Sequence, residues 1–223
     1  MSEVIITVRG EHETRVAPEL GIADISVRCE GPSRGPVVER IAALAAPVRD
    51  ELSRRQADGD VAEWSSERAA VWSERPWNNE GKQLAPVHHA SVSFSASFSD
   101  FAALSWWLTA VSEREGVQVH TVVWQLTPAT RRAVEAEVAA EAVRIAVSRA
   151  TAYATAIDRG GVTPLEIADT GLLTRAETPP QAAPRMMRAA MMSSDAAGTG
   201  PGIDLQPQPI IVTAGVEGRF AAR

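Results

Sequence analysis

The segment from Ala90 to Ser99 constrains the fold of this 223-residue chain more than any other. Serine occupies every odd position from Ser91 onward, and the even positions are apolar: Ala90, Val92, Phe94, Ala96 and Phe98. Because successive side chains of a strand point to opposite faces, this alternation predicts a strand with one buried and one solvated face. Such a strand belongs in an antiparallel sheet, or in a sheet covered on one side only.

Hydrophobic periodicity predicts the remaining elements. The segments with strand patterns are 4–9, 22–29, 61–72, 90–99, 117–126, 165–167 and 210–220. The segments with apolar residues at helical spacing are 37–56, 101–115 and 127–158. The order is therefore β-β-α-β-β-α-β-α-β-loop-β. We expect an α/β (α+β) fold, in which one mixed, largely antiparallel sheet carries three helices packed on it.

Local signals refine the helix boundaries. Asp100 is a candidate N-cap for the second helix, and Gly116 ends that segment. Pro128 stands near the first turn of the third helix, where proline is tolerated. Pro47 falls inside the first helix, and we expect it to kink or interrupt that helix because it removes a backbone donor.

A length of 223 residues fits one large domain or two small ones, and we expect a single domain over residues 1–223, interrupted by an insertion. Between about 174 and 209 the composition shifts to proline, alanine, methionine and glycine, which predicts a mobile insertion. Met186, Met187, Met191 and Met192 within it could form one flexible apolar patch for protein contacts. The alternative is a disordered insertion with incidental methionines.

Net charge and hydropathy limit the kinds of partner and the cellular compartment that we expect. The formal net charge of −6 argues against broad binding to nucleic acid or to an anionic membrane. No stretch approaches the roughly 20 apolar residues that cross a bilayer. If this start is the native one, the lack of a signal-peptide pattern predicts a cytoplasmic protein.

We find no pattern typical of a catalytic, cofactor or metal site. His88 and His89 are adjacent, so they face opposite sides of a strand, and with His120 they lack the spaced cluster that zinc needs. The glycine-rich run at 198–202 is better interpreted as a linker than as a phosphate-binding loop. Cys29, the one cysteine, lies on an apolar strand face and is expected to be a small buried residue.

Trp106 and Trp107 form the notable aromatic pair of the chain. Neighbours on a helix project about 100° apart, so both are hard to bury against the same sheet. We expect one in the core and the other at a contact with a partner, since tryptophan is enriched at interface hot spots. If the helix is sandwiched, both can be core.

Several segments also share their order and spacing with a known family. Ile6-Thr7-Val8-Arg9-Gly10-Glu11 leads through Pro18-Glu19 into the strand at 22–30. A long alanine-rich helix ends at Gly160-Gly161, and the strand sequence IIVTAGVEGRF follows at 210–220. Together these segments resemble the SIMPL domain family of bacteria.

The resemblance implies an α/β fold with a mixed or antiparallel sheet and packed helices. Known members are often exported and can form large homo-oligomers, so it also implies self-association. The family has no agreed catalytic residues, and none is carried over. This chain departs from the family pattern at His12, where a second glycine is usual, at Glu19, where an aspartate is usual, and in lacking an export signal.

We therefore expect a non-enzymatic, self-associating domain that binds another protein and needs no cofactor. The rival hypothesis is a small-molecule binding protein, or an enzyme of unrecognised type. Its site would lie between the sheet and the insertion, near Trp72, Trp124 or His120.

Overall fold

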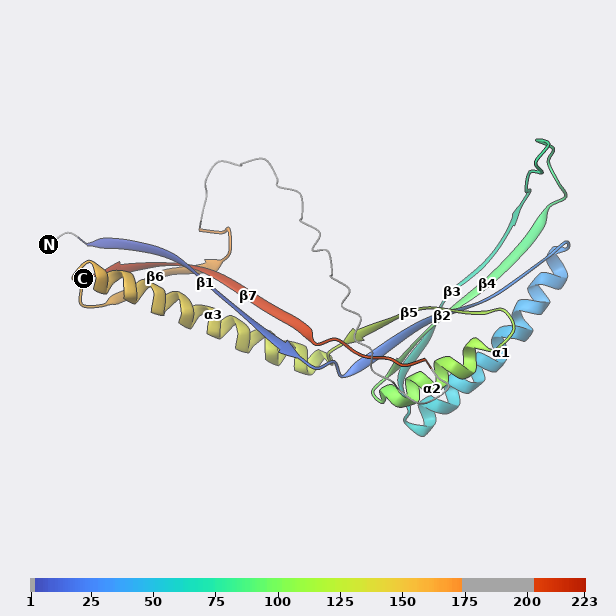
Figure 1. Cartoon of the computed structure of the whole chain (residues 1–223), viewed down its shortest axis with the longest axis horizontal. Helices are drawn as coiled ribbons and strands as arrows, with labels where there is room; N and C mark the ends of the chain where they lie inside the picture. The colour runs from blue at the N-terminus through green and yellow to red at the C-terminus, as the bar shows by residue number, and fades with distance from the viewer. Residues whose placement is uncertain (1–2, 174–202) are drawn as a thin grey trace. The chain divides into compact units, whose positions relative to one another are not determined.

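The computed structural model describes residues 3–173 and 203–223, and its elements follow the predicted order (Figure 1). The α/β class is confirmed. The elements are β1 (Val4–Val16), β2 (Leu20–Gly31), α1 (Arg34–Asp58), β3 (Val61–Glu74), β4 (Val87–Phe98), α2 (Phe101–Ser112), β5 (Val117–Gln125), α3 (Pro128–Ala156), β6 (Val162–Asp169) and β7 (Ile210–Ala222).

The strands form two sheets, so the prediction of one mixed sheet is wrong. One sheet has the order β1-β7-β6, the other has the order β3-β4-β2-β5, and every pairing is antiparallel. The chain divides accordingly into two compact units, here named the three-stranded unit and the four-stranded unit. Pro18 separates β1 from β2 and has no N–H for a ladder, which favours a break between the two strands.

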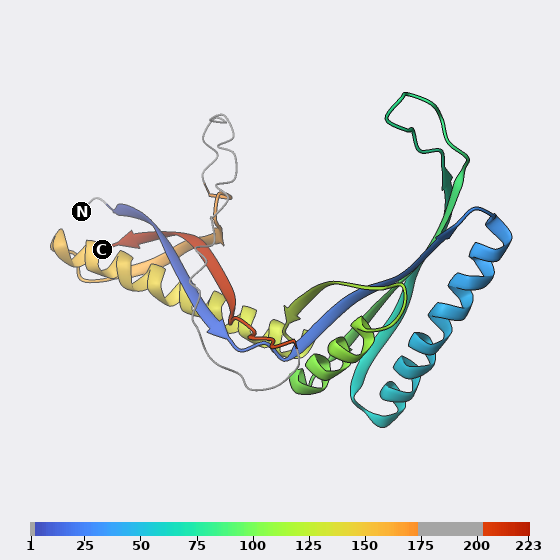
Figure 2. The same ribbon diagram turned by 45° about the vertical axis from the view of Figure 1, so that its right-hand side comes forward.

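In the four-stranded unit, α1 and α2 cover the same face of the sheet (Figure 2). The predicted alternation of β4 is confirmed, because its even-numbered apolar side chains point into this core and Phe98 is fully buried. Strand β2 contributes Ala23, Ile25 and Val27, each with an exposed fraction of 0%. The opposite face carries the serines of β4 and has no helix over it among the described residues.

Helix α1 runs through Pro47, so of the two predicted effects an interruption is wrong, and a kink stays a prediction. Pro47 lies on the exposed side of α1, and so does Ala43, whose carbonyl loses its partner four residues on. Water can reach that carbonyl, which makes the proline tolerable. Gly59 ends the helix in the left-handed conformation, with a φ of 89°.

A buried carboxylate ties α1 to the turn after α2. Glu51 has an exposed side-chain fraction of 9%, accepts a 3.0 Å hydrogen bond from Arg55 Nε, and also pairs with Arg114. Burial alone would raise the pKa of Glu51, but the hydrogen bonds from Arg55 and Arg114 outweigh it and lower this pKa.

In the three-stranded unit, α3 packs on β1 and β7 with small side chains. Its buried residues recur every four positions: Val138, Ala142, Ala146, Ala150 and Ala154. A Cβ on Gly10 would overlap the Ala142 carbonyl oxygen and lie 2.6 Å from the Ala146 backbone nitrogen. Strand and helix backbones therefore touch directly at Gly10, as the alanine-rich sequence of this helix predicts.

Gly10→Ala is expected to lower the free energy of unfolding by about 2 kcal/mol or more, since its methyl group meets fixed backbone atoms. Urea unfolding of the full chain measures this change. Gly35→Ala is the matched control, because nothing lies within 4 Å of its added methyl group and alanine favours the helix. Equal stability of Gly10→Ala and the wild type would contradict the close packing.

Acid is expected to remove the stabilisation from Glu51. Because its pKa is lowered on folding, the unfolded chain takes up the proton first as pH falls below about 5. Glu51→Gln should cost about 1–3 kcal/mol at pH 7, a difference from wild type that shrinks towards pH 3. Urea unfolding at several pH values measures it, and a difference that is constant with pH would contradict the assignment.

Candidate functional site

A polar cluster on the uncovered face of the four-stranded sheet surrounds His89. Trp72 lies opposite His89 in the β3–β4 register, and the two rings stack with centroids 5.2 Å apart and planes inclined by 15°. His89 Nδ1 lies 3.3 Å from Glu30 Oε2, and His89 Nε2 lies 3.2 Å from Glu74 Oε1. The first carboxylate belongs to β2 and the second to β3, so three strands build this cluster.

A hollow of about 350 Å³ opens beside this cluster and is lined by Arg28, Cys29, Glu30, Trp72, His89 and Ala90. The side chain of His89 is 16% exposed, and its Nε2 makes no hydrogen bond of good geometry despite the nearby carboxylate. The hollow thus offers an aromatic face, an imidazole, the Glu30 carboxylate and the Arg28 guanidinium. This arrangement can hold a small polar or cationic group.

The surroundings of Cys29 in this hollow do not activate its thiol as a nucleophile. Its Sγ donates a 3.4 Å hydrogen bond to the Val37 carbonyl, and the side chain packs against the core of the unit. Burial raises the pKa of the Cys29 thiol. A thiol with a raised pKa is protonated at neutral pH and reacts poorly.

His120 and Ser26 form the one serine–histidine hydrogen bond that links neighbouring strands β5 and β2, with Nε2 and Oγ 2.8 Å apart. A β-bulge after Asp24 shifts the register there. Ser26 is 1% exposed, so its hydroxyl is closed to a substrate in this conformation. The contact satisfies a buried polar group. The sequence did not indicate this pair, because a bulge cannot be read from alternation alone.

Trp72, Trp124 and His120, the alternative locations named for the rival site, lie apart from one another. Trp124 lies opposite Gly21 at one end of β2, with its ring against Phe101 at a centroid distance of 4.8 Å. Trp72 and His89 lie beside Glu30, nine positions further along β2, which is roughly 30 Å at about 3.3 Å per residue. The insertion expected to lie beside this site comprises residues 174–209. Of these, residues 174–202 lie outside the described part of the chain.

The histidines are also separate. His88 is bonded through Nδ1 to the Ser73 hydroxyl at 2.6 Å, whereas its neighbour His89 faces Trp72, as strand alternation predicts. His120 contacts neither of them but pairs with Ser26. Within residues 3–173 and 203–223, no group of three or more His, Cys, Asp or Glu side chains could hold a metal ion.

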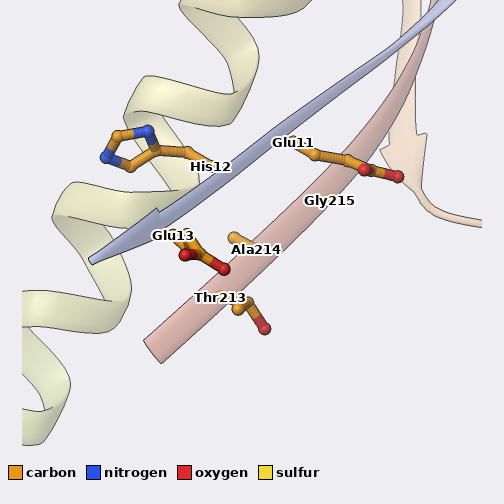
Figure 3. Close-up of a pocket in the computed structure, with 6 residues that line it drawn as sticks. All are labelled: Glu11, His12, Glu13, Thr213, Ala214 and Gly215. Atoms are coloured by element: carbon orange, nitrogen blue, oxygen red, sulfur yellow. The ribbon is translucent and has the colours of Figure 1, made fainter. Parts of the chain in front are cut away.

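A second hollow, of about 450 Å³, lies on the two-stranded end of β1 and β7 and is lined by Glu11, His12, Glu13, Thr213, Ala214 and Gly215 (Figure 3). Its ionisable side chains do not converge. Figure 3 shows His12 on the side of α3, with Glu11 and Glu13 directed elsewhere. This hollow is therefore a surface depression without a common point for a ligand.

The tryptophan pair on α2 has the predicted arrangement. Trp107 is fully buried, with its ring 5.2 Å from that of Phe98, and Trp106 is 64% exposed. A contact of Trp106 with a partner stays a prediction. Met186, Met187, Met191 and Met192, and the glycine-rich run at 198–202, lie outside the described residues.

Two antiparallel sheets, one packed against α1 and α2 and the other against α3, define an α/β protein. The model of the SIMPL family, described as a protein of unknown function (DUF541), matches residues 6–220, and the chain belongs to this family. No curated protein is significantly similar to it in sequence. None of the described helices is long and apolar enough to cross a membrane.

The two neighbouring tryptophans are expected to respond differently to truncation. Trp107→Ala should lower the free energy of unfolding by about 3–5 kcal/mol, because it leaves a cavity beneath Phe98. Trp106→Ala should stay within about 0.5 kcal/mol of the wild type. Urea unfolding of both variants measures these changes, and a large loss for Trp106→Ala would contradict its exposed position.

Proposed function

We propose that this chain is a non-enzymatic, self-associating domain that works through protein contacts. The observation that carries the proposal is the length of strand edge that has no neighbouring strand among the residues that the structure describes. Strand β1, of 13 residues, and strand β3, of 14 residues, are outer strands of their sheets. An unpaired edge presents a row of N–H and C=O groups, which is a template for pairing with another chain.

Exposed aromatic side chains on ordered backbone support the same function. Trp106 projects from α2, and Trp77, 67% exposed, projects from the loop between β3 and β4. That loop is held by Asn78, whose Oδ1 accepts hydrogen bonds from the backbone nitrogens of Glu80 and Lys82. Rigid tryptophans bury a large area at a low entropic cost, which suits them to protein interfaces.

The placement of the reactive side chains favours a non-enzymatic role. Cys29 is half-buried with a raised thiol pKa, and Ser26 is closed off beneath its contact with His120. The imidazole of His89 lies between two carboxylates instead of beside a nucleophile. Each of these three side chains, Cys29, Ser26 and His89, is held by contacts within the fold, and these contacts support a structural role for it.

Small-molecule binding is the second candidate function, favoured by the hollow beside Trp72 and His89. Titration of the full chain with small organic cations, followed by tryptophan fluorescence, tests it. A signal that disappears in Trp72→Phe and His89→Ala, and persists in Trp106→Phe, would favour ligand binding over self-association as the role of this face.

Light scattering on the full chain at micromolar concentrations tests the proposed function. We expect a mass that is a multiple of 23.8 kDa and falls on dilution. A strict monomer over the whole concentration range would contradict self-association. Net charge keeps the chain soluble enough for the measurement at pH 7.

A further inference from the structure

We infer that β1 is the surface through which two copies of this chain associate. The two β1 strands pair antiparallel about a twofold axis at Gly10, so that two three-stranded sheets become one sheet of six strands. This inference rests on the proposed self-association and names its contact. Four observations on the three-stranded unit support it.

The first observation is the direction of the backbone groups of β1. The carbonyl oxygen of Gly10 lies 4.0 Å from the position of a Cβ on Gly215, so it points towards β7. Carbonyls alternate in direction along a strand, so that of Arg9 points the other way. There it accepts a 2.8 Å hydrogen bond from Arg149 Nη1. The odd-numbered residues of β1 therefore present their N–H and C=O groups at the outer edge.

The second observation is that this edge has no strand beside it in the part of the chain that the structure describes. Strand β1 pairs with β7 over its whole length, Val4 to Val16, and with no other strand. Arg149 occupies one lone pair of the Arg9 carbonyl, and the second lone pair stays available to a strand. The Arg149 contact is therefore compatible with an added strand.

The third observation is the charge pattern along the solvated face of β1. In an antiparallel pair with its twofold axis at Gly10, Arg9 lies opposite Glu11 of the second copy, and Glu11 lies opposite its Arg9. Glu13 then lies opposite Thr7. Arg9 already pairs within its own chain with Glu217 at 3.1 Å and with Glu11 at 3.5 Å, and this register adds two attractive pairs across the axis and no repulsive pair.

Neighbouring registers place like charges opposite each other. An axis at Arg9 pairs Arg9 with itself. An axis at Glu11 pairs Glu11 with itself, although it also places Arg9 opposite Glu13. An axis at His12 pairs Glu11 with Glu13 and Arg9 with Arg15. Like charges directly opposite each other are destabilising, so the charge sequence selects Gly10 among these axes. A strand that is complementary to itself fits a second copy better than an unrelated chain.

The fourth observation is an exposed aromatic on the same flank of α3. Tyr153 follows Arg149 by four residues, so the two side chains lie on one side of the helix. Arg149 reaches the free edge of β1, and Tyr153 is 53% exposed. Pairing of the two β1 strands brings the second copy's α3 to this flank, where Tyr153 loses exposure to water.

Charge reversal tests the register. Glu11→Arg places arginine opposite Arg9 at two symmetric positions, and we expect it to raise the dissociation constant of the dimer at least tenfold. Glu13→Arg makes the same change in net charge but faces Thr7, so it should leave the dissociation constant within about twofold of the wild type. Equal effects of the two variants in sedimentation velocity would overturn the Gly10 axis.

Removal of a donor tests the edge itself. Thr7→Pro deletes an N–H that points away from β7 and keeps the ladder between β1 and β7. We expect it to be monomeric where Thr7→Ala associates like the wild type. Circular dichroism of both variants shows whether they are folded. If Thr7→Pro does not fold, the comparison of Glu11→Arg with Glu13→Arg tests the β1 contact instead.

The outcomes separate this inference from the function on which it rests. If the wild type is monomeric at all concentrations, self-association and the β1 contact both fall. If the wild type associates and folded Thr7→Pro associates equally well, the β1 contact is wrong and self-association stands on another surface. The β1 contact is supported if Thr7→Pro and Glu11→Arg lose association while Thr7→Ala and Glu13→Arg keep it.

Discussion

The contact between the backbones of β1 and α3 at Gly10 is the constraint on which the three-stranded unit depends. Glycine there, with Ala142 and Ala146 across from it, lets strand and helix approach until only backbone and methyl groups separate them. The short side chains bury little area each, so the unit relies on many such contacts along α3. A narrow sheet of three strands with one helix results, and within residues 3–173 and 203–223 no strand lies beside the outer edge of β1.

In the four-stranded unit, large side chains fill the space between the sheet and its helices. Phe98, Trp107 and Leu52 fill the space between its sheet and the helices α1 and α2, and each is fully buried. Its uncovered face keeps polar groups that satisfy one another, as in the bond between Ser26 and His120. The two units therefore differ in how they pack, although both leave one sheet face to solvent.

The sequence predicts which face of each helix or strand is buried. It does not predict which strands pair with one another. The alternation in β4 and the opposite exposures of Trp106 and Trp107 follow from strand and helix geometry alone. The division into two sheets does not, because alternation is the same whichever strand lies alongside. The bulge that brings His120 to Ser26 is a register shift and leaves no mark in the periodicity. Pro47 is tolerated because its side of α1 meets water.

Amide hydrogen exchange along β1 is the sharpest test of the pairing between two β1 strands, because it distinguishes the two edges of one strand. The amides of Val8 and Gly10 face β7, and the account predicts that they are protected at every protein concentration. The amides of Thr7 and Glu11 face outward, and they should be protected only at concentrations where the chain associates. Rapid exchange of these outward amides in a fully associated sample would contradict the account.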